Sequence, residues 1–139
     1  MIACLLLPYF TAEVMRRLHN SSLEAPLVVL SSGGKVSACS ENAACKGIVP
    51  GLSRAQVHWY CSEARLVDAD EDALQRAERQ VLDTCAFFTP RVEATPGGQV
   101  HAFYLDLERL APLEAQNLAG MLLSRLKIIL GLEGQIGLA

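Results

Sequence analysis

The sequence has few residues of the kinds that mark secreted, membrane-spanning or metal-binding proteins. It contains 6 prolines and 5 cysteines in 139 residues, and no two cysteines have the C-x-x-C spacing of zinc or redox sites. An odd cysteine count predicts free thiols. The first apolar run, residues 2–7, is too short to cross a bilayer and lacks the flanks of a secretory signal. We therefore predict a cytoplasmic protein without membrane association.

Charge is also scarce. Charged residues make up 19% of the chain and hydrophobic residues 51%, a composition typical of an ordered domain. The net charge of −3 disfavours strong DNA binding by the chain alone. Residues 16–65 nevertheless carry six basic and three acidic side chains. Residues 68–93 carry three basic and seven acidic side chains. The basic part could face phosphates, or it could be ordinary solvated surface.

Hydrophobic periodicity and turn residues predict a mixed α/β chain. We expect strands at 2–7, 27–30, 36–40, 65–67, 91–94, 100–107 and 135–139, and helices at 11–18, 41–46, 53–59, 71–88 and 113–130. Without residues 26–67 the order is β-α-β-β-α-β, which predicts a ferredoxin-like sandwich carrying an inserted subdomain. Residues 1–25 and 68–139 would form the main domain.

Three local features support these elements. Ser53 and Asp70 are suitable N-caps for the helices that follow them. The turn between the two strands near residue 97 is predicted from Thr95, Pro96, Gly97 and Gly98. In the last helix, one apolar face is expected to contact the core through Leu113, Leu118, Leu122, Leu126 and Ile129.

Four segments resemble, in order and spacing, the Y-family translesion DNA polymerases. They are residues 4–10, 42–52, 88–93 with 103–107, and 134–139. The first corresponds to the family's opening strand, the second to its fingers motif, and the third to the palm hairpin that normally carries an Asp-Glu pair. The resemblance implies a palm formed by residues 1–25 and 68–139, truncated at its C-terminal end, and fingers formed by residues 26–67.

The catalytic carboxylates implied by the resemblance are missing. Leu5 and Leu7 occupy the positions of the first-strand aspartates, and His101 and Ala102 those of the hairpin Asp-Glu pair. Polymerase chemistry needs Mg²⁺ held by carboxylate oxygens. Leucine and alanine have no ligand atoms, and histidine suits Mg²⁺ poorly. We therefore expect no catalytic residue, no metal site and no cofactor.

The nucleotide pocket implied by the resemblance is altered as well. Glu41 and Ala44 stand where the family has a tyrosine and an arginine that grip the triphosphate, and Cys45 replaces the lysine that follows. A carboxylate at 41 would repel a triphosphate. Lys46 could substitute in a shifted register. Phe10 matches the bulky residue that excludes the ribose 2′-hydroxyl, and without metals we expect it to pack in the core.

This pattern of loss is similar to the ImuB branch of the family, whose members keep the polymerase shape and act as adaptors in bacterial mutagenic repair. The resemblance implies a non-enzymatic scaffold in translesion synthesis, weak contact with DNA, and three partners: a sliding clamp, a RecA-like protein and a C-family polymerase. The segments that bind the partners lie in later domains of the family, so we expect this chain to be a fragment of a longer protein.

Two other functions stay open. An active polymerase could take carboxylates from Glu13 or Glu93 in an altered register. A protein-interaction module with no DNA role would fit the negative net charge. Among smaller features, the acidic residues at 68–72 could bind a cation or complement a helix N-terminus. The aromatic segment 58–60 could stack on a base, or form the partly buried end of a short helix.

Overall fold

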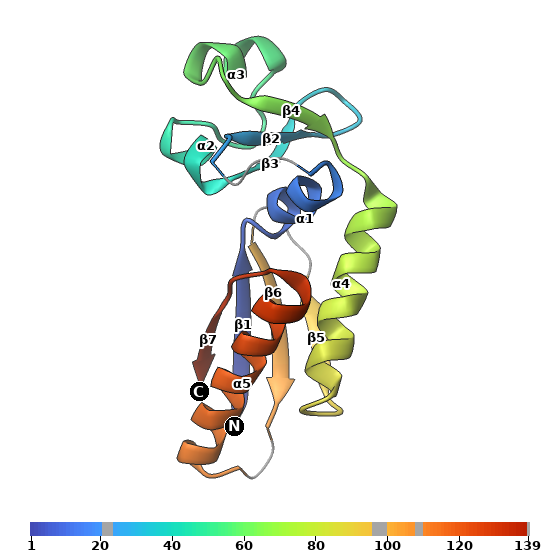
Figure 1. The fold of residues 1–139 in the computed structure, drawn as a ribbon, viewed down its shortest axis with the longest axis vertical. Coiled ribbons are helices and arrows are strands. Elements are labelled where there is room, and N and C mark those ends of the chain that lie inside the picture. Colours follow the sequence, from blue (N-terminus) through green and yellow to red (C-terminus); the bar gives the residue numbers. More distant parts are fainter. Residues whose placement is uncertain (21–23, 96–99, 108–109, 139) are drawn as a thin grey trace. The chain divides into compact units, whose positions relative to one another are not determined.

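The computed structural model describes residues 1–20, 24–95, 100–107 and 110–138 (Figure 1). The chain forms two compact units. Unit 1 comprises Met1–Pro8 and Arg76–Ala139, and unit 2 comprises Tyr9–Gln75. Pro96, Gly97 and Gly98 of the predicted turn, and Ala139 of the last predicted strand, lie outside the described residues.

Unit 1 contains a four-stranded antiparallel sheet. Its strands are β1 (Ile2–Pro8), β5 (Val92–Thr95), β6 (Val100–Asp106) and β7 (Gln135–Leu138), in the order β5-β6-β1-β7. Helix α4 (Glu71–Ala86) precedes β5, and helix α5 (Pro112–Leu130) connects β6 to β7. The connectivity β-α-β-β-α-β and this strand order confirm the predicted ferredoxin-like sandwich.

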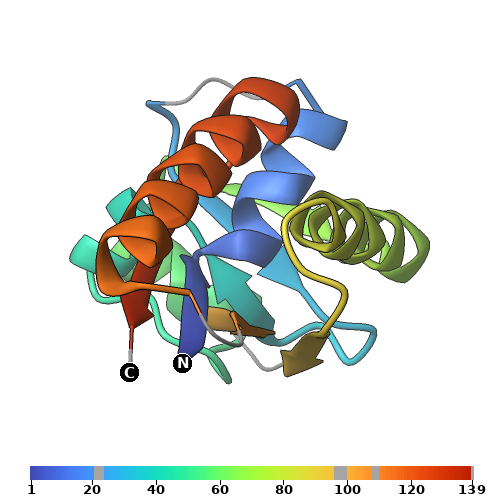
Figure 2. The same cartoon turned by 90° about the horizontal axis from the view of Figure 1, so that it is seen from below.

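Both helices cover the same face of this sheet. Figure 2 shows α5 and the part of α4 that belongs to unit 1 on one side of the four strands. Side chains alternate between the two faces of a strand, and burial follows that alternation along β1. Ala3, Leu5 and Leu7 are buried, whereas Ile2 and Leu6 are exposed and Cys4 is half-buried. The face with Leu6 is therefore the open face, and the face with Leu5 is the helix face.

The core side of α5 differs from the prediction. Ala115, Leu122, Leu126 and Leu130 are buried, at intervals of seven and four residues. Leu113 and Ile129, predicted to contact the core, are exposed instead. The reason is that α5 has apolar residues on more than one face, so the periodicity alone does not identify the inner one.

Unit 2 contains a three-stranded sheet and short helices. Helix α1 (Phe10–Leu18) is followed by β2 (Leu27–Leu30), β3 (Val36–Cys39), α2 (Glu41–Cys45), α3 (Arg54–Tyr60) and β4 (Arg65–Asp68). Strand β2 is central, antiparallel to β3 and parallel to β4. All four residues of β2 are buried, because one face of the sheet contributes to a cluster around Ile48 and the other to a cluster around Met15.

Both predicted N-caps are confirmed. The hydroxyl of Ser53 accepts a hydrogen bond from the Gln56 amide at 3.3 Å, and the Gln56 side chain accepts one from the Ser53 amide at 2.9 Å. This reciprocal pair is a capping box. The Asp70 carboxylate accepts a hydrogen bond from the Ala73 amide at 3.0 Å. Each cap satisfies backbone donors that the first helical turn leaves without a partner.

The boundaries of the two units differ from those expected for the palm and fingers. The expected borders were at residues 25/26 and 67/68, whereas the units divide at 8/9 and 75/76. Helix α1 belongs to unit 2 because Ala12 and Met15 pack against Leu27 and Val29 of β2. The assignment of palm and fingers stays a prediction. Among the described residues, no helix is both long and apolar enough for a membrane span.

Candidate functional site on the four-stranded sheet

The first-strand positions Leu5 and Leu7 face the helices, not solvent. Their side chains are 0% and 1% exposed. Gly134, just before β7, packs against them so closely that a Cβ there would lie 2.7 Å from Leu7 Cδ2 and 3.2 Å from Leu5 Cδ1. The two leucines are therefore part of the core of unit 1, in a place where an ionised side chain would be strongly destabilising.

The hairpin positions His101 and Ala102 lie on opposite faces of β6. His101 is the register partner of Leu7, and Ala102 that of Leu6. Directly opposite residues of neighbouring strands share a face. His101 thus lies with the leucines on the helix face, and Ala102 lies with Leu6 on the open face. The structure does not bring the four predicted positions together at one point.

A divalent cation from solvent could reach the open face, where Leu6 is 36% exposed. The pair at this point is Leu6 and Ala102, and neither offers a ligand atom for Mg²⁺. The resemblance placed the family's first-strand aspartates at Leu5 and Leu7, so the sequence analysis did not identify Leu6 as a site position. Strand alternation was the signal that could have found it, because a strand with Leu5 and Leu7 in the core must present Leu6 on the other side.

The two carboxylates on the strands of this sheet do not complete a metal site with this pair. Glu93 lies on β5 opposite Tyr104, and Asp106 lies at the far end of β6 opposite Ile2. The Asp106 carboxylate forms an ion pair with Arg91 at 3.5 Å. Among the residues that the structure describes, no group of three or more His, Cys, Asp or Glu side chains is placed to hold a metal. The residues present do not fit the Mg²⁺ ions that the family resemblance implies.

Burial changes the acid–base behaviour of His101. Desolvation lowers the pKa of its imidazole below the usual value, and the nearby Glu78 carboxylate partly opposes this effect. A histidine with a lowered folded-state pKa stays neutral in the folded protein over a range in which the unfolded chain takes up a proton. Folding is therefore less favourable below about pH 6.5, the pKa of the unfolded chain.

We predict that His101→Gln flattens the pH dependence of stability. Between about pH 7 and pH 5 the unfolding free energy of the original protein should fall more than that of the variant, because only the former loses stability as unfolded His101 is protonated. Urea unfolding followed by circular dichroism at both pH values measures the difference. Parallel pH profiles would show that His101 is not the titrating group.

The nucleotide-pocket positions lie in unit 2. Phe10 begins α1 and is 1% exposed, so its ring has no free face for a sugar. Glu41, Ala44 and Cys45 lie on α2, where Glu41 and Cys45 are exposed and Ala44 packs against the cluster around Ile48. None of these three side chains supplies a cation for a triphosphate.

Lys46, which could have replaced the missing lysine, forms an ion pair with Glu63. A hydrogen bond from Lys46 lowers the pKa of the Glu63 carboxyl to about 2. Both side chains are about half exposed. The charge of Lys46 is thus partly neutralised within unit 2, which weakens its capacity to attract a phosphate.

Other sequence candidates have local structural roles. Glu13 forms an ion pair with Arg16 at 3.3 Å on α1. Within the acidic segment 68–72, Asp70 is the N-cap of α4, as expected for a cluster that complements a helix N-terminus. The expected partial burial of segment 58–60 is wrong for Trp59, whose side chain is 88% exposed.

Comparison with known proteins adds a family and a fold. A model of the impB/mucB/samB family matches residues 5–139. No curated protein sequence matches the chain.

Solved structures match over the whole chain. A ternary complex of Dbh with partially disordered substrates has a TM-score of 0.88 at 18% identity and covers 100% of this chain. An insertion ternary complex of Dbh DNA polymerase has a TM-score of 0.88 at 19% identity, and DinB from Sulfolobus solfataricus a TM-score of 0.88 at 18% identity. This chain covers 41–42% of the length of those chains. At this identity the likeness establishes the fold.

Proposed function

This chain belongs to the impB/mucB/samB family, and we propose that it is the palm-and-fingers part of a Y-family polymerase-like protein without polymerase activity. Its role is that of a scaffold in translesion synthesis and DNA repair. The fold of Dbh and DinB over the whole chain supports the Y-family part of the proposal. Because the chain spans about two-fifths of those proteins, the activity and partners of a whole protein are part of the proposal too.

One observation carries the absence of catalysis. Every position at which the family resemblance places a carboxylate holds a side chain that suits Mg²⁺ poorly or not at all: Leu5, Leu7, His101 and Ala102. The open face beside them presents Leu6, which has no ligand atoms either. Phosphoryl transfer depends on metal ions that neutralise the developing charge. Among the described residues, no group of three or more His, Cys, Asp or Glu side chains is placed to hold a metal that would supply this neutralisation.

A scaffold needs the shape of the polymerase and surfaces for its partners, not the chemistry. The retained sheet order and the packed core support a retained shape. The resemblance to the ImuB branch supplies the proposed partners: DNA bound weakly, a sliding clamp, a RecA-like protein and a C-family polymerase.

Two titrations test the proposal. Addition of Mg²⁺ to about 10 mM should leave the melting temperature unchanged, because a ligand stabilises only a protein that binds it. Binding to a fluorescent primer–template should be weak and should decrease as salt rises, because phosphate contacts release counterions. Thermal denaturation measures the melting temperature, and fluorescence anisotropy measures the binding of the primer–template.

The two measurements separate the competing functions. A clear stabilisation by Mg²⁺, together with nucleotide incorporation, would favour an active polymerase that uses Glu93 or Glu13. DNA binding that is undetectable even at low salt would favour a protein-interaction module. Sodium chloride at the same ionic strength is the control for the Mg²⁺ titration.

A further inference from the structure

The outward face of α5 is unusually apolar for a helix in solvent. Met121 and Ile128 are 61% and 83% exposed, and Leu113 and Ile129 are exposed as well. Phe87, which follows α4, is also exposed. Scattered apolar residues on a surface are ordinary, but a contiguous group is typical of a surface that another molecule covers.

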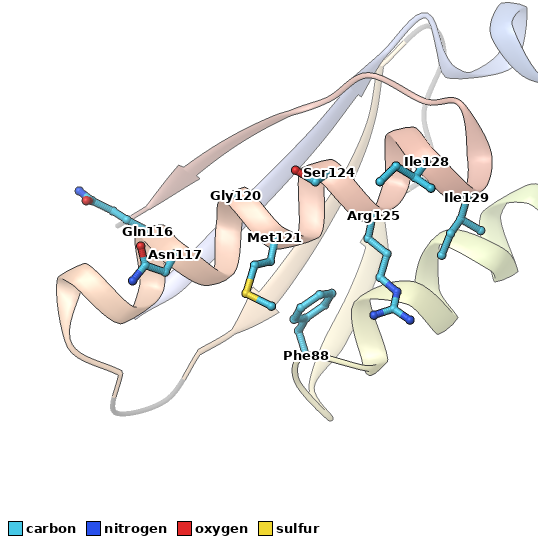
Figure 3. A pocket seen from close by; sticks show the side chains of 9 residues that line it. All are labelled: Phe88, Gln116, Asn117, Gly120, Met121, Ser124, Arg125, Ile128 and Ile129. Atoms are coloured by element: carbon cyan, nitrogen blue, oxygen red, sulfur yellow. The ribbon is translucent and has the colours of Figure 1, made fainter.

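A groove runs along this face. It has a volume of about 760 Å³, and its walls include Phe88, Gly120, Met121, Ser124, Arg125 and Ile128. In Figure 3, the side chains of Met121 and Arg125 project from α5 on either side of the Phe88 ring. The small residues Gly120 and Ser124 lie one helical turn apart, so the backbone of α5 is accessible there.

Gly120 is the least expected residue of the helix. Glycine destabilises a helix interior relative to alanine. Its backbone does not need positive φ, and a Cβ at this position would meet no atom within 4 Å. Nothing in the described part of the chain therefore requires glycine at 120. Glycine at 120 would favour a helix docked from outside, because small residues allow two helix backbones to approach closely.

Arg125 gives the groove its charge. Among the described residues that line the groove, it is the one with a charged side chain. Its guanidinium lies 4.3 Å from the centroid of the Phe87 ring, an arrangement in which the ring attracts the cation and holds it beside the groove. An acidic side chain on a docked partner would be electrostatically complementary to Arg125.

A second copy of this chain is a poorer occupant. In a two-fold dimer, the same patch meets itself. Two copies of α5 that crossed at Gly120 and Ser124 would bring their Arg125 side chains into the same region. Like charges that meet in a desolvated interface oppose association.

We propose that this α5 groove binds an amphipathic helix of another protein, with apolar residues along Met121 and Ile128 and an acidic residue beside Arg125. Helices bind to apolar grooves through anchors spaced at i, i+3, i+4 and i+7, which suits a groove along the axis of α5. The proposal concerns a surface of unit 1 remote in sequence from Leu6 and Ala102, and it does not depend on the loss of catalysis.

Two synthetic helical peptides of about 18 residues test it, a length that gives about five turns. Both carry the same leucine stripe, and they differ only in having glutamate or lysine at the flanking position that meets Arg125. We expect the glutamate peptide to bind about tenfold more tightly to the original protein. Arg125→Glu should reverse this preference. Gly120→Leu should abolish the binding of both peptides, because the added side chain fills the groove.

Fluorescence anisotropy gives the affinities, and amide chemical shifts of Gly120, Ser124 and Ile128 locate the site. Circular dichroism checks that both variants remain folded, as expected for two exposed positions. The proposal would be overturned by any of three results: equal affinities for the two peptides, no binding of either peptide, or unchanged binding to Gly120→Leu. Concentration-dependent dimerisation that Gly120→Leu removes would also overturn it, since the occupant would then be a second copy.

Discussion

Leu5→Asp should destabilise unit 1 by about 4–5 kcal/mol, the combined effect of losing a buried leucine and burying a carboxyl group. Leu5 is fully buried, and Gly134 packs against its Cδ1 atom. Small domains have a total stability of only about 5–15 kcal/mol. We therefore expect unit 1 of this variant to be largely or partly unfolded at room temperature.

Leu6→Asp is the matched control, one residue along the same strand. Its side chain is on the open face, and the expected cost is about 1 kcal/mol, mainly from the low strand propensity of aspartate. Amide hydrogen exchange in β1 and β6 measures both effects within unit 1. The fluorescence of Trp59 would be a poor probe, because this residue is exposed and belongs to unit 2. Equal costs for the two substitutions would show that the assignment of the two faces is wrong.

A second large effect is expected from Leu6→Asp combined with Ala102→Glu. These residues are register partners on the open face, so two carboxylates there would lie directly opposite each other on neighbouring strands. With a dissociation constant of about 1 mM, about 10 mM Mn²⁺ would stabilise the double variant by about 1.4 kcal/mol. In a domain of this size, that corresponds to a rise in melting temperature of about 3–5 °C.

The neutral pair Leu6→Asn with Ala102→Gln is the control, since it has a similar shape but lacks the two negative charges that attract the cation. Neither this pair nor the original protein should respond to Mn²⁺. An equal shift in all three proteins would place the binding site elsewhere. Without Mn²⁺, the carboxylate pair should be less stable than the neutral pair, because like charges directly opposite in a sheet repel each other.

The sequence predicted the strands and helices well because their local signals are strong. The signals are the apolar run at 2–7 and the cap residues Ser53 and Asp70, and each acts within a few residues. The order of these elements then limited the topology to the β-α-β-β-α-β arrangement that the structure has.

The faces of the elements were harder to predict, because they depend on contacts between distant parts of the chain. In β1 every residue from Ile2 to Leu7 is apolar, so composition does not distinguish Leu5 from Leu6. The distinction arises from the helices that cover one side of the sheet. The same difficulty affected α5, where Leu113 and Ile129 resemble core residues in sequence and are exposed in the structure.

The candidate site was therefore predictable in composition but not in geometry. The lack of carboxylates at Leu5, Leu7, His101 and Ala102 can be read from the resemblance alone. That these positions are divided between two faces follows from the register of β1 and β6, which no local pattern specifies.

The separation of the two faces of β1 also bears on how such a protein can evolve. The helix face supports the core, so selection for folding restrains Leu5 and Leu7. The open face is restrained mainly by what it binds. Under the proposed loss of catalysis, substitutions at Leu6 and Ala102 remove ligand atoms without disturbing the core, so an ancestor becomes inactive and keeps its fold.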